Sequence, residues 1–339
     1  MIEKDYPIDF VVTWVDGNDP VWQAEKAKYS PSKNADNRNV RFRDWDNMQY
    51  WFRAVEKFAP WVNKIHFVTY GHLPKWLNID NPKLNIAKHS DFIPQKYLPT
   101  FSSQPIELNL HRINGLAERF VYFNDDMFLL RPVKRELFFA GKDCLPTDFA
   151  ITSTISTTTK EDMMPFIKLN CVTILNGHFD KKEQMKKHFS KWMNLAYGWN
   201  ALRNLIFYGQ HRFKGFANNH LAFSFLKSEY EDIWEKEYES LDDTSSHKFR
   251  SKLDLDNWLI RYWQLTRGNF YPIGRHVKGK VYEIYNGVEQ NQELFKIIEN
   301  QAMPMICIND NDNVDFEPMK ERIKQAFDRI LPEKSSFEK

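Results

Sequence analysis

The sequence predicts an α/β fold with a mostly parallel sheet and a mainly helical lobe inserted into it. Short β-branched and aromatic runs alternate with helical patterns over the first 130 residues, which is typical of βαβ units. Residues from about 160 to 265 are different, being mostly helical in pattern with many Lys, Trp and Phe. At 339 residues, 42% of them hydrophobic, the chain is long enough for one large domain or two with a sizeable core.

Three strands and one helix are expected in the first 90 residues. Each strand is a short β-branched and aromatic or apolar run, and they cover residues 8–14, 64–70 and 84–87. A turn at residues 16–20 ends the first strand, and the polar residues 30–39 are expected to form a loop. A helix should begin near Asp46, because apolar residues recur at helical spacing until Pro60.

The next helix and strand lead to the most informative stretch of the chain. The helix begins at Pro105 and turns four apolar residues inward, namely Ile106, Leu110, Ile113 and Leu116. The strand begins at Phe120, and its apolar run leads into Asn124, Asp125 and Asp126. Ligands in α/β proteins bind at the carboxyl ends of such buried strands, where this polar triplet falls.

The C-terminal part repeats this pattern of an apolar strand followed by Asn and Asp. Residues 305–308 are the strand and residues 309–313 the polar cluster, and a terminal helix follows from about Glu317 to Leu331. We expect residues 1–150 and 285–335 to form the core domain. Residues 151–284 then form the helical lobe.

The two Asn-Asp segments indicate a metal site. Asp125 and Asp126 are costly to hold side by side unless a cation or hydrogen-bond donors compensate their charges. Mg²⁺ prefers oxygen ligands and uses one or two carboxylates together with substrate phosphates, so Asp310 of the second segment could complete the site. Two ordinary polar turns explain the same residues without a metal.

Three further side chains could carry chemistry. His220 is suited to act as a general base near neutral pH, or is a hydrogen-bonded core histidine. Arg250 could bind phosphate with its fork of donors, or form a surface salt bridge. Glu107, near the start of its helix, has an ordinary explanation as a favourable N-terminal charge. Phosphate-binding loop, dinucleotide-fingerprint, HExxH and GxSxG motifs are absent, which excludes the enzyme classes they mark.

Composition bounds the partners and the compartment. The formal net charge of +2, from 47 basic and 45 acidic residues, does not indicate nucleic-acid binding. The basic run at residues 181–188 indicates a solvated helix face, or contact with an anionic membrane surface or polyanionic acceptor. Three distant cysteines without CxxC spacing indicate a reducing compartment, and we find neither a signal peptide nor an apolar run long enough to span a bilayer. We therefore expect a soluble protein in the cytoplasm or at the inner face of the membrane.

Segments in order along the chain resemble the four characteristic regions of the Stealth family. This family comprises bacterial capsular polysaccharide hexose-1-phosphate transferases and the catalytic subunit of the lysosomal-enzyme GlcNAc-1-phosphotransferase. The first region is similar to residues 8–20 and the fourth to residues 306–311. The third is similar to residues 220–228 together with residues 249–251. The second resembles segments between Arg41 and Asp126, which are residues 41–53, 59–62, 98–103, 106–107, 111–113 and 123–126.

The resemblance implies a sugar-1-phosphate transferase on a Rossmann-like core of the nucleotide-sugar transferase type. By position, four residues fall where the family's essential residues fall, and these are Glu107, Asp126, His220 and Arg250. Asp310 falls where the family has a second metal-region aspartate. The implied partners are a nucleotide-sugar donor, most often a UDP-sugar, and an oligosaccharide or polysaccharide acceptor. Peripheral association with the inner membrane or capsule machinery, and a homo-oligomer, are also compatible with it.

The hypothesis that follows assigns a role to each residue. Asp126 and Asp310 hold Mg²⁺ or Mn²⁺ on the diphosphate with help from Asp125, Arg250 stabilises phosphoryl oxygens, and His220 accepts the proton of the acceptor hydroxyl. Glu107 orients His220 or a donor hydroxyl. The nucleotide is expected to contact Trp14, Asp16, Gly17, Asp19 and Arg53. Two rival hypotheses are a metal-dependent glycosyltransferase that releases UDP, and a non-catalytic carbohydrate-binding component of a capsule-synthesis complex.

Overall fold

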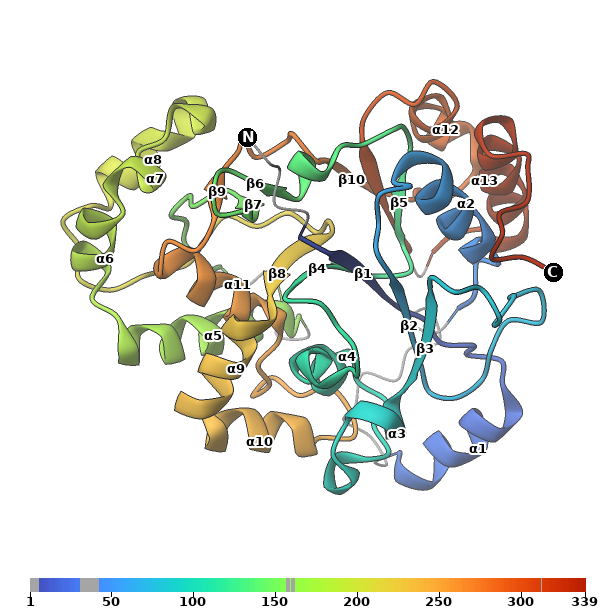
Figure 1. Ribbon diagram of the computed structural model, residues 1–339, viewed down its shortest axis with the longest axis horizontal. Coiled ribbons are helices and arrows are strands. Elements are labelled where there is room, and N and C mark those ends of the chain that lie inside the picture. The colour runs from blue at the N-terminus through green and yellow to red at the C-terminus, as the bar shows by residue number, and fades with distance from the viewer. Residues whose placement is uncertain (1–5, 31–42, 157–158, 160–161, 312) are drawn as a thin grey trace.

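A five-stranded sheet forms the centre of the molecule (Figure 1). The computed structural model describes residues 6–30, 43–156, 159, 162–311 and 313–339. The strand order is β3-β2-β1-β4-β8, with β1 to β4 parallel and β8 antiparallel to β4. The strands are β1 Ile8–Thr13, β2 Ile65–Thr69, β3 Leu84–Lys88, β4 Arg119–Phe123 and β8 Phe223–Leu226. The predicted α/β class, the mostly parallel sheet and the first three strands are confirmed.

The sheet separates two apolar cores, because successive residues of a strand point to opposite faces. On β1, Phe10 and Val12 join one core while Val11 joins the other. Helices α2, α12 and α13 cover the first face, and α4, α5, α9 and α11 cover the second. Their bounds are α2 Met48–Phe58, α4 Ser103–Leu108, α5 Met164–His178, α9 Lys227–Lys236, α11 Asn257–Thr266, α12 Gln292–Glu299 and α13 Phe316–Ile330. The helix expected after Asp46 and the terminal helix are confirmed.

A second, three-stranded sheet lies beside the first and contains β5, the strand that follows β4 in the chain. Its order is β10-β11-β5, with β5 Met127–Leu129, β10 Gly279–Glu283 and β11 Met305–Asn309. The expected strand at residues 305–308 is β11, which lies antiparallel to β5 with Cys307 opposite Met127. Gly279 allows β10 and β11 to approach, since a Cβ there would lie 1.8 Å from the carbonyl oxygen of Met305. The strand that leads into the second Asn-Asp cluster therefore pairs with the strand that follows the first cluster.

The remaining elements lie around these sheets. A small sheet joins β6 Phe139–Ala140, β7 Leu145–Asp148 and β9 Tyr271–Pro272. The other helices are α1 Pro20–Tyr29, α3 His89–Phe92, α6 Lys181–Lys187, α7 Phe189–Trp192, α8 Ala201–Ile206 and α10 Tyr238–Ser246. Within residues 151–284, β8 pairs with β4 of the central sheet and β10 pairs with β11. The division into a core and a helical lobe stays a prediction.

One expected helix is wrong in length. The helix predicted from Pro105 to Leu116 ends at Leu108, and a 3₁₀ turn at Leu110–Arg112 follows. Asn109 interrupts it, because its side-chain amide donates to the carbonyl oxygen of Pro105 at 2.8 Å. The expected loop at 30–39, apart from Ser30, and residues 41–42 lie outside the described residues. In the described part of the chain, the helices are all too short or too polar to cross a bilayer.

Candidate active site

The carboxyl ends of β1 and β4 meet at the middle of the central sheet. The order β3-β2-β1-β4 reverses direction between these two strands, which is where ligands bind in open α/β sheets. The loop Trp14–Asp19 follows β1, and the turn Asn124–Asp126 follows β4. The structure thus brings the two sequence-predicted segments to one edge of the sheet.

Local hydrogen bonds shape the first segment. The backbone N–H of Asp16 donates to Nε2 of His72 at 2.8 Å, and the Trp14 ring contacts the His72 ring with centroids 5.3 Å apart. The Asp19 carboxylate accepts from the Trp22 N–H at 2.7 Å and so caps α1. Asp19 therefore has a structural role in addition to any contact with a nucleotide.

His220 reaches the turn after β4 from the opposite direction along the sheet. Because β8 is antiparallel to β4, the residues before β8 lie next to the end of β4. His220 Nε2 is 3.5 Å from Asp126 Oδ2 and 3.4 Å from Asn124 Nδ2. The His220 side chain is 42% exposed, which leaves it accessible to a substrate. Cys307 Sγ of β11 lies 3.3 Å from the same Asp126 oxygen.

Two arginines hold the chain just before His220. Arg261 is buried and forms a bidentate pair with Asp148, at 2.7 and 2.8 Å, while donating to Asn218 Oδ1 at 2.6 Å. Arg275 Nε donates to Asn219 Oδ1 at 3.1 Å. Sequence reasoning missed both arginines, because neither lies near His220 in the chain or in a recognisable motif.

Arg250 and Glu107 meet on α4. Arg250 donates to Ser103 Oγ at 3.1 Å and to Gln104 Oε1 at 3.2 Å, and Glu107 lies one turn further along the same helix. Burial raises the pKa of Glu107, and the positive charge of Arg250 opposes that rise. Tyr122 of β4 donates a long hydrogen bond of 3.4 Å to Glu107. Two of the four residues predicted to be catalytic are therefore brought together at α4.

Carboxylates concentrate at the ends of β1 and β4. The pKa of Asp125 is raised to about 7, first by the removal of water from around its carboxylate and then by the negative charges of Asp126 and Asp44. Part of the residue remains exposed to solvent. Burial also raises the pKa of Asp44, as do the charges of Asp46 and Asp16. Asp44 was not singled out from the sequence, where its only signal is its place within the family-like residues 41–53.

Positive and negative neighbours act on His220 in opposite directions. Burial alone lowers the pKa of His220, but Asp126 and Glu107 raise it above its ordinary value. Lys168 of α5 opposes protonation of His220, so its charge lies within electrostatic reach. Lys168 is a further residue that the sequence did not indicate. The charges of both signs that act on His220 therefore come from different elements of the fold.

The residues of the turn fit a divalent cation. Asp126 Oδ1 is buried and has no hydrogen-bond partner in the described part of the chain. Asp126, His220 and Cys307 also bring one potential ligand atom each within 4.8 Å of one another. The orphaned carboxylate oxygen and these neighbouring nitrogen and sulfur atoms make the turn a candidate metal site, and their mixed chemistry does not identify the metal.

Two sequence-predicted residues have other partners. Asp310 is not in that group of potential ligands, since its carboxylate accepts two bonds from Arg43, at 3.0 and 2.6 Å, and one from Trp45 Nε1 at 3.0 Å. Arg53 forms a bidentate pair with Glu338, at 2.8 and 2.7 Å, and donates to the carbonyl oxygen of Leu331. The structure therefore does not bring these two side chains into direct contact with Asp126 or His220.

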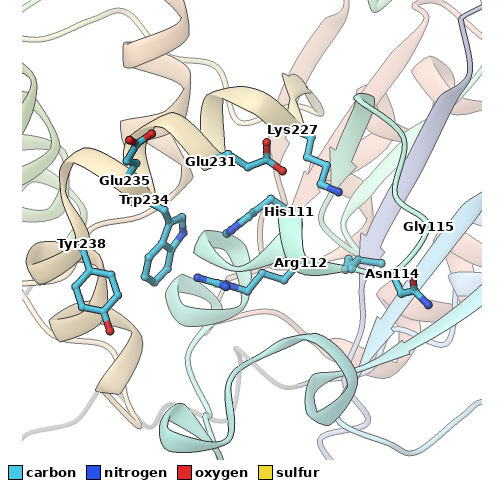
Figure 2. Close-up of a pocket in the computed structure, with 10 residues that line it drawn as sticks. His111, Arg112, Asn114, Gly115, Lys227, Glu231, Trp234, Glu235 and Tyr238 are labelled. Carbon is cyan, nitrogen blue, oxygen red and sulfur yellow. The ribbon is translucent and has the colours of Figure 1, made fainter.

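A separate cavity of about 630 Å³ opens near the beginning of β4, between the residues before that strand and α9. The Arg112 guanidinium covers the ring of Trp234 there, 4.7 Å from its centroid (Figure 2). The lining residues are His111, Arg112, Ile113, Asn114, Gly115, Lys227, Glu231, Trp234, Glu235 and Tyr238. None of the sequence-predicted site residues lines this cavity, which lies toward the other end of β4 from Asp126.

Two family models match the chain. Stealth protein CR1, conserved region 1, matches residues 6–34, and Stealth protein CR2, conserved region 2, matches residues 41–145. The first match contains the loop Trp14–Asp19. The second contains Glu107 and the turn Asn124–Asp126.

Curated relatives match over nearly the full length of the chain. The capsular polysaccharide phosphotransferase WcwK of Streptococcus pneumoniae is 42% identical, with 98% of each chain covered. The receptor polysaccharide phosphotransferase WefC of Streptococcus gordonii is 41% identical, with 100% of each covered. The exopolysaccharide phosphotransferase cps2G of Lactiplantibacillus plantarum is 39% identical, over 98% of this chain and 97% of the relative. Among solved structures, the galactosyltransferase LgtC covers 95% of this chain and 96% of its own at 9% identity, and its TM-score of 0.37 is too low to support an argument.

Proposed function

The chain belongs to the Stealth family, and from this premise we propose that it is a sugar-1-phosphate transferase of capsular polysaccharide synthesis. It would move hexose-1-phosphate or N-acetylhexosamine-1-phosphate from a UDP-sugar to a hydroxyl of an oligosaccharide or polysaccharide acceptor. The names of its relatives, which are polysaccharide phosphotransferases, support the reaction class. The proposal places the enzyme in the cytoplasm or at the inner face of the membrane.

The observation that carries the proposal is the contact between His220 and Asp126 at the ligand-binding edge of the sheet, at 3.5 Å. The acceptor hydroxyl oxygen attacks the phosphorus nearest the donor sugar, and the bond from that phosphorus to the bridging oxygen of the diphosphate breaks. UMP leaves, and the sugar phosphate becomes a phosphodiester. His220 takes the hydroxyl proton, for which its half-exposed position and its carboxylate neighbour are suited.

Cationic side chains stabilise the transferring group in this proposal. Arg250 is anchored by Ser103 and Gln104, so its guanidinium is held at the edge of the site before substrate arrives. Lys168 adds a second positive charge within reach of His220. The charges of Arg250 and His220 both favour the ionised form of Glu107. Glu107 would orient His220 or a donor hydroxyl.

Asp125 and Asp126 would hold Mg²⁺ or Mn²⁺, with Asp310 as a further ligand once Arg43 releases it. The ion would neutralise charge on the donor diphosphate when bound. A cation beside Asp125 favours its ionised form, which offsets the rise in its pKa.

The nucleotide would lie along the loop after β1. Trp14, Asp16, Gly17 and Asp19 are its proposed contacts. Gly17 is tied to α1, because its carbonyl oxygen accepts from Gln23 Nε2 at 2.7 Å. Arg53 would reach a nucleotide only after leaving Glu338.

The test is the identity of the released nucleotide. The protein is incubated with a panel of UDP-sugars and a short capsule oligosaccharide, and UMP and UDP are separated and quantified. We expect UMP in a one-to-one ratio with a phosphodiester product. UDP without UMP would instead identify a metal-dependent glycosyltransferase, and saccharide binding without either nucleotide would identify a carbohydrate-binding component.

A further inference from the structure

Large apolar side chains gather on the part of the helical lobe that projects furthest from the central sheet. This part, which we call the arm, comprises residues 180–214 and contains α6, α7 and α8, at the left of Figure 1. Six of its large apolar residues are exposed, namely Leu195 (94%), Trp199 (88%), Ile206 (74%), Leu205 (60%), Phe189 (52%) and Leu202 (48%). Soluble proteins scatter such residues singly, so a cluster within eighteen residues of chain requires an explanation.

The geometry of α8 places its apolar residues on one side. Asn204 is fully buried and anchors the helix, because its side chain bonds to the carbonyl oxygens of Ala150 and Trp192, each at 2.6 Å. Residues two positions away on either side of Asn204 point in nearly the opposite direction, at about 100° of rotation per residue. Leu202 and Ile206 occupy those positions and therefore face away from the protein.

The neighbouring turn and helix extend this apolar side. Leu195 and Trp199 belong to the 3₁₀ segment Leu195–Asn200, which leads directly into α8. The ring of Phe189 on α7 lies 6.4 Å from the ring of Tyr208, just after α8. The exposed ring of α7 thus lies beside the residues that follow α8.

The charge of the arm is opposite to that of the rest of the chain. The arm contains eight Lys and Arg residues and two acidic residues, a formal charge of +6, so the remainder of this +2 chain carries −4. Its Asp180 is already paired with His211 at 2.6 Å and caps α6. The exposed cations are Lys182, Lys186, Lys187, Arg203, Arg212 and Lys214.

We propose that the arm docks onto the surface of an anionic lipid bilayer. Short helices that insert apolar side chains at the headgroup boundary while cations contact anionic lipids have this composition. A second copy of the chain is a poorer occupant, because a two-fold interface would bring two +6 arms together and lysine is depleted in interface cores. The six-residue α8 lies on the membrane rather than across it.

Docking through the arm would tether the enzyme to the bilayer surface. Residues 216–220 connect the arm to His220, and Arg261 bonds to this connection through the Ala217 carbonyl oxygen and Asn218. An acceptor saccharide carried on a lipid would then share a membrane surface with the enzyme. The docking itself is independent of the proposed transfer reaction.

Vesicle flotation tests the proposal. The full-length protein is mixed with vesicles of phosphatidylcholine alone or of phosphatidylcholine with phosphatidylglycerol. We expect flotation only with the anionic vesicles and its loss in high salt. The double substitution Leu205→Ser/Ile206→Ser should weaken vesicle binding at least about tenfold, because each buried aliphatic side chain contributes on the order of one tenfold step. Lys186→Glu/Lys187→Glu should also weaken it.

Matched controls separate the arm from general surface effects. Val21 and Leu253 are 70% and 72% exposed outside the arm, so Val21→Ser/Leu253→Ser should float like the wild type. Equal flotation of the Leu205/Ile206 variant and the wild type, or no flotation of the wild type, would overturn the proposal. Light scattering gives a further check, since a wild-type dimer that Leu205→Ser/Ile206→Ser dissociates would assign the patch to self-association. Flotation without UMP release would leave the docking intact and reject only the proposed reaction.

Discussion

Replacing His220 by Gln tests the base directly while keeping a polar side chain in its place. A positioned general base contributes about 10²–10⁴-fold to a rate, so kcat should fall by that factor, or about 3–5 kcal/mol of barrier. Among the described residues, the His220 side chain makes two long polar contacts, 3.5 Å to Asp126 and 3.4 Å to Asn124, and it is 42% exposed. The loss of these contacts should change the free energy of unfolding by less than about 1 kcal/mol.

The assay is the initial rate of UMP release at saturating donor and acceptor, with urea unfolding of the same preparation. His178→Gln is the matched control, because His178 is also partly exposed beside a carboxylate, that of Glu237, but lies outside the site. The control should keep its rate within about twofold of the wild type. A His220→Gln enzyme that retains more than a tenth of the wild-type kcat would refute the base assignment. A large loss of stability would show that His220 is mainly a packing residue.

Three other changes should have distinct effects. Chelation by EDTA should stop UMP release and added Mg²⁺ or Mn²⁺ should restore it, whereas undiminished release would count against Asp125 and Asp126 as ligands. Arg250→Lys keeps the charge but loses the fork that bonds to Ser103 and Gln104, so kcat should drop at least about tenfold with an unchanged Tm, as measured by nucleotide release and calorimetry. Asp9→Asn should cost about 3–5 kcal/mol in urea unfolding, because fully buried Asp9 pairs with fully buried His66 at 3.0 Å. Burial alone raises the pKa of Asp9, but hydrogen bonds from His66, Asn63 and Ala117 hold it below its ordinary value. The stabilisation from ionised Asp9 is therefore present above about pH 4 and is lost as the pH falls further. Asp9→Asn should make the free energy of unfolding less dependent on pH in this acid range.

The central sheet could be predicted because each of its parallel strands has a recognisable local sequence pattern. β1 and β2 are β-branched and aromatic runs that a turn ends, and such runs separate clearly from helical periods. β8 could not be found in this way, since its four residues, Phe223–Leu226, lie within mostly helical sequence and carry no decisive period. Its pairing with β4 nevertheless decides the position of His220.

In the site, too, features with a local sequence pattern could be predicted and long-range contacts could not. The polar turn after β4 stood out because Asn and Asp interrupt an apolar run, and β11 does lie beside it, with the Ile308 N–H donating to the Asp126 carbonyl oxygen at 2.8 Å. The direction of the Asp310 carboxylate was not predictable, because its partner Arg43 is 267 residues away in the chain. Ion pairs between such distant residues leave no local pattern in a single sequence.

The proposed attack at phosphorus and the rival attack at the sugar carbon make different demands on the charges of the site. When a sugar–oxygen bond breaks, negative charge develops on the leaving diphosphate, and a cation held by the carboxylate-rich turn would be sufficient to stabilise it. When phosphorus is attacked, negative charge also lies on the phosphoryl oxygens beside the incoming hydroxyl, so cations are needed near the base as well. The positive charge of Lys168 lowers the pKa of His220, and the negative charge of Glu107 raises it. The positive charge of Arg250 favours the ionised form of Glu107. In the proposed phosphotransferase reaction, this positive charge would stabilise the phosphoryl oxygens beside the incoming hydroxyl.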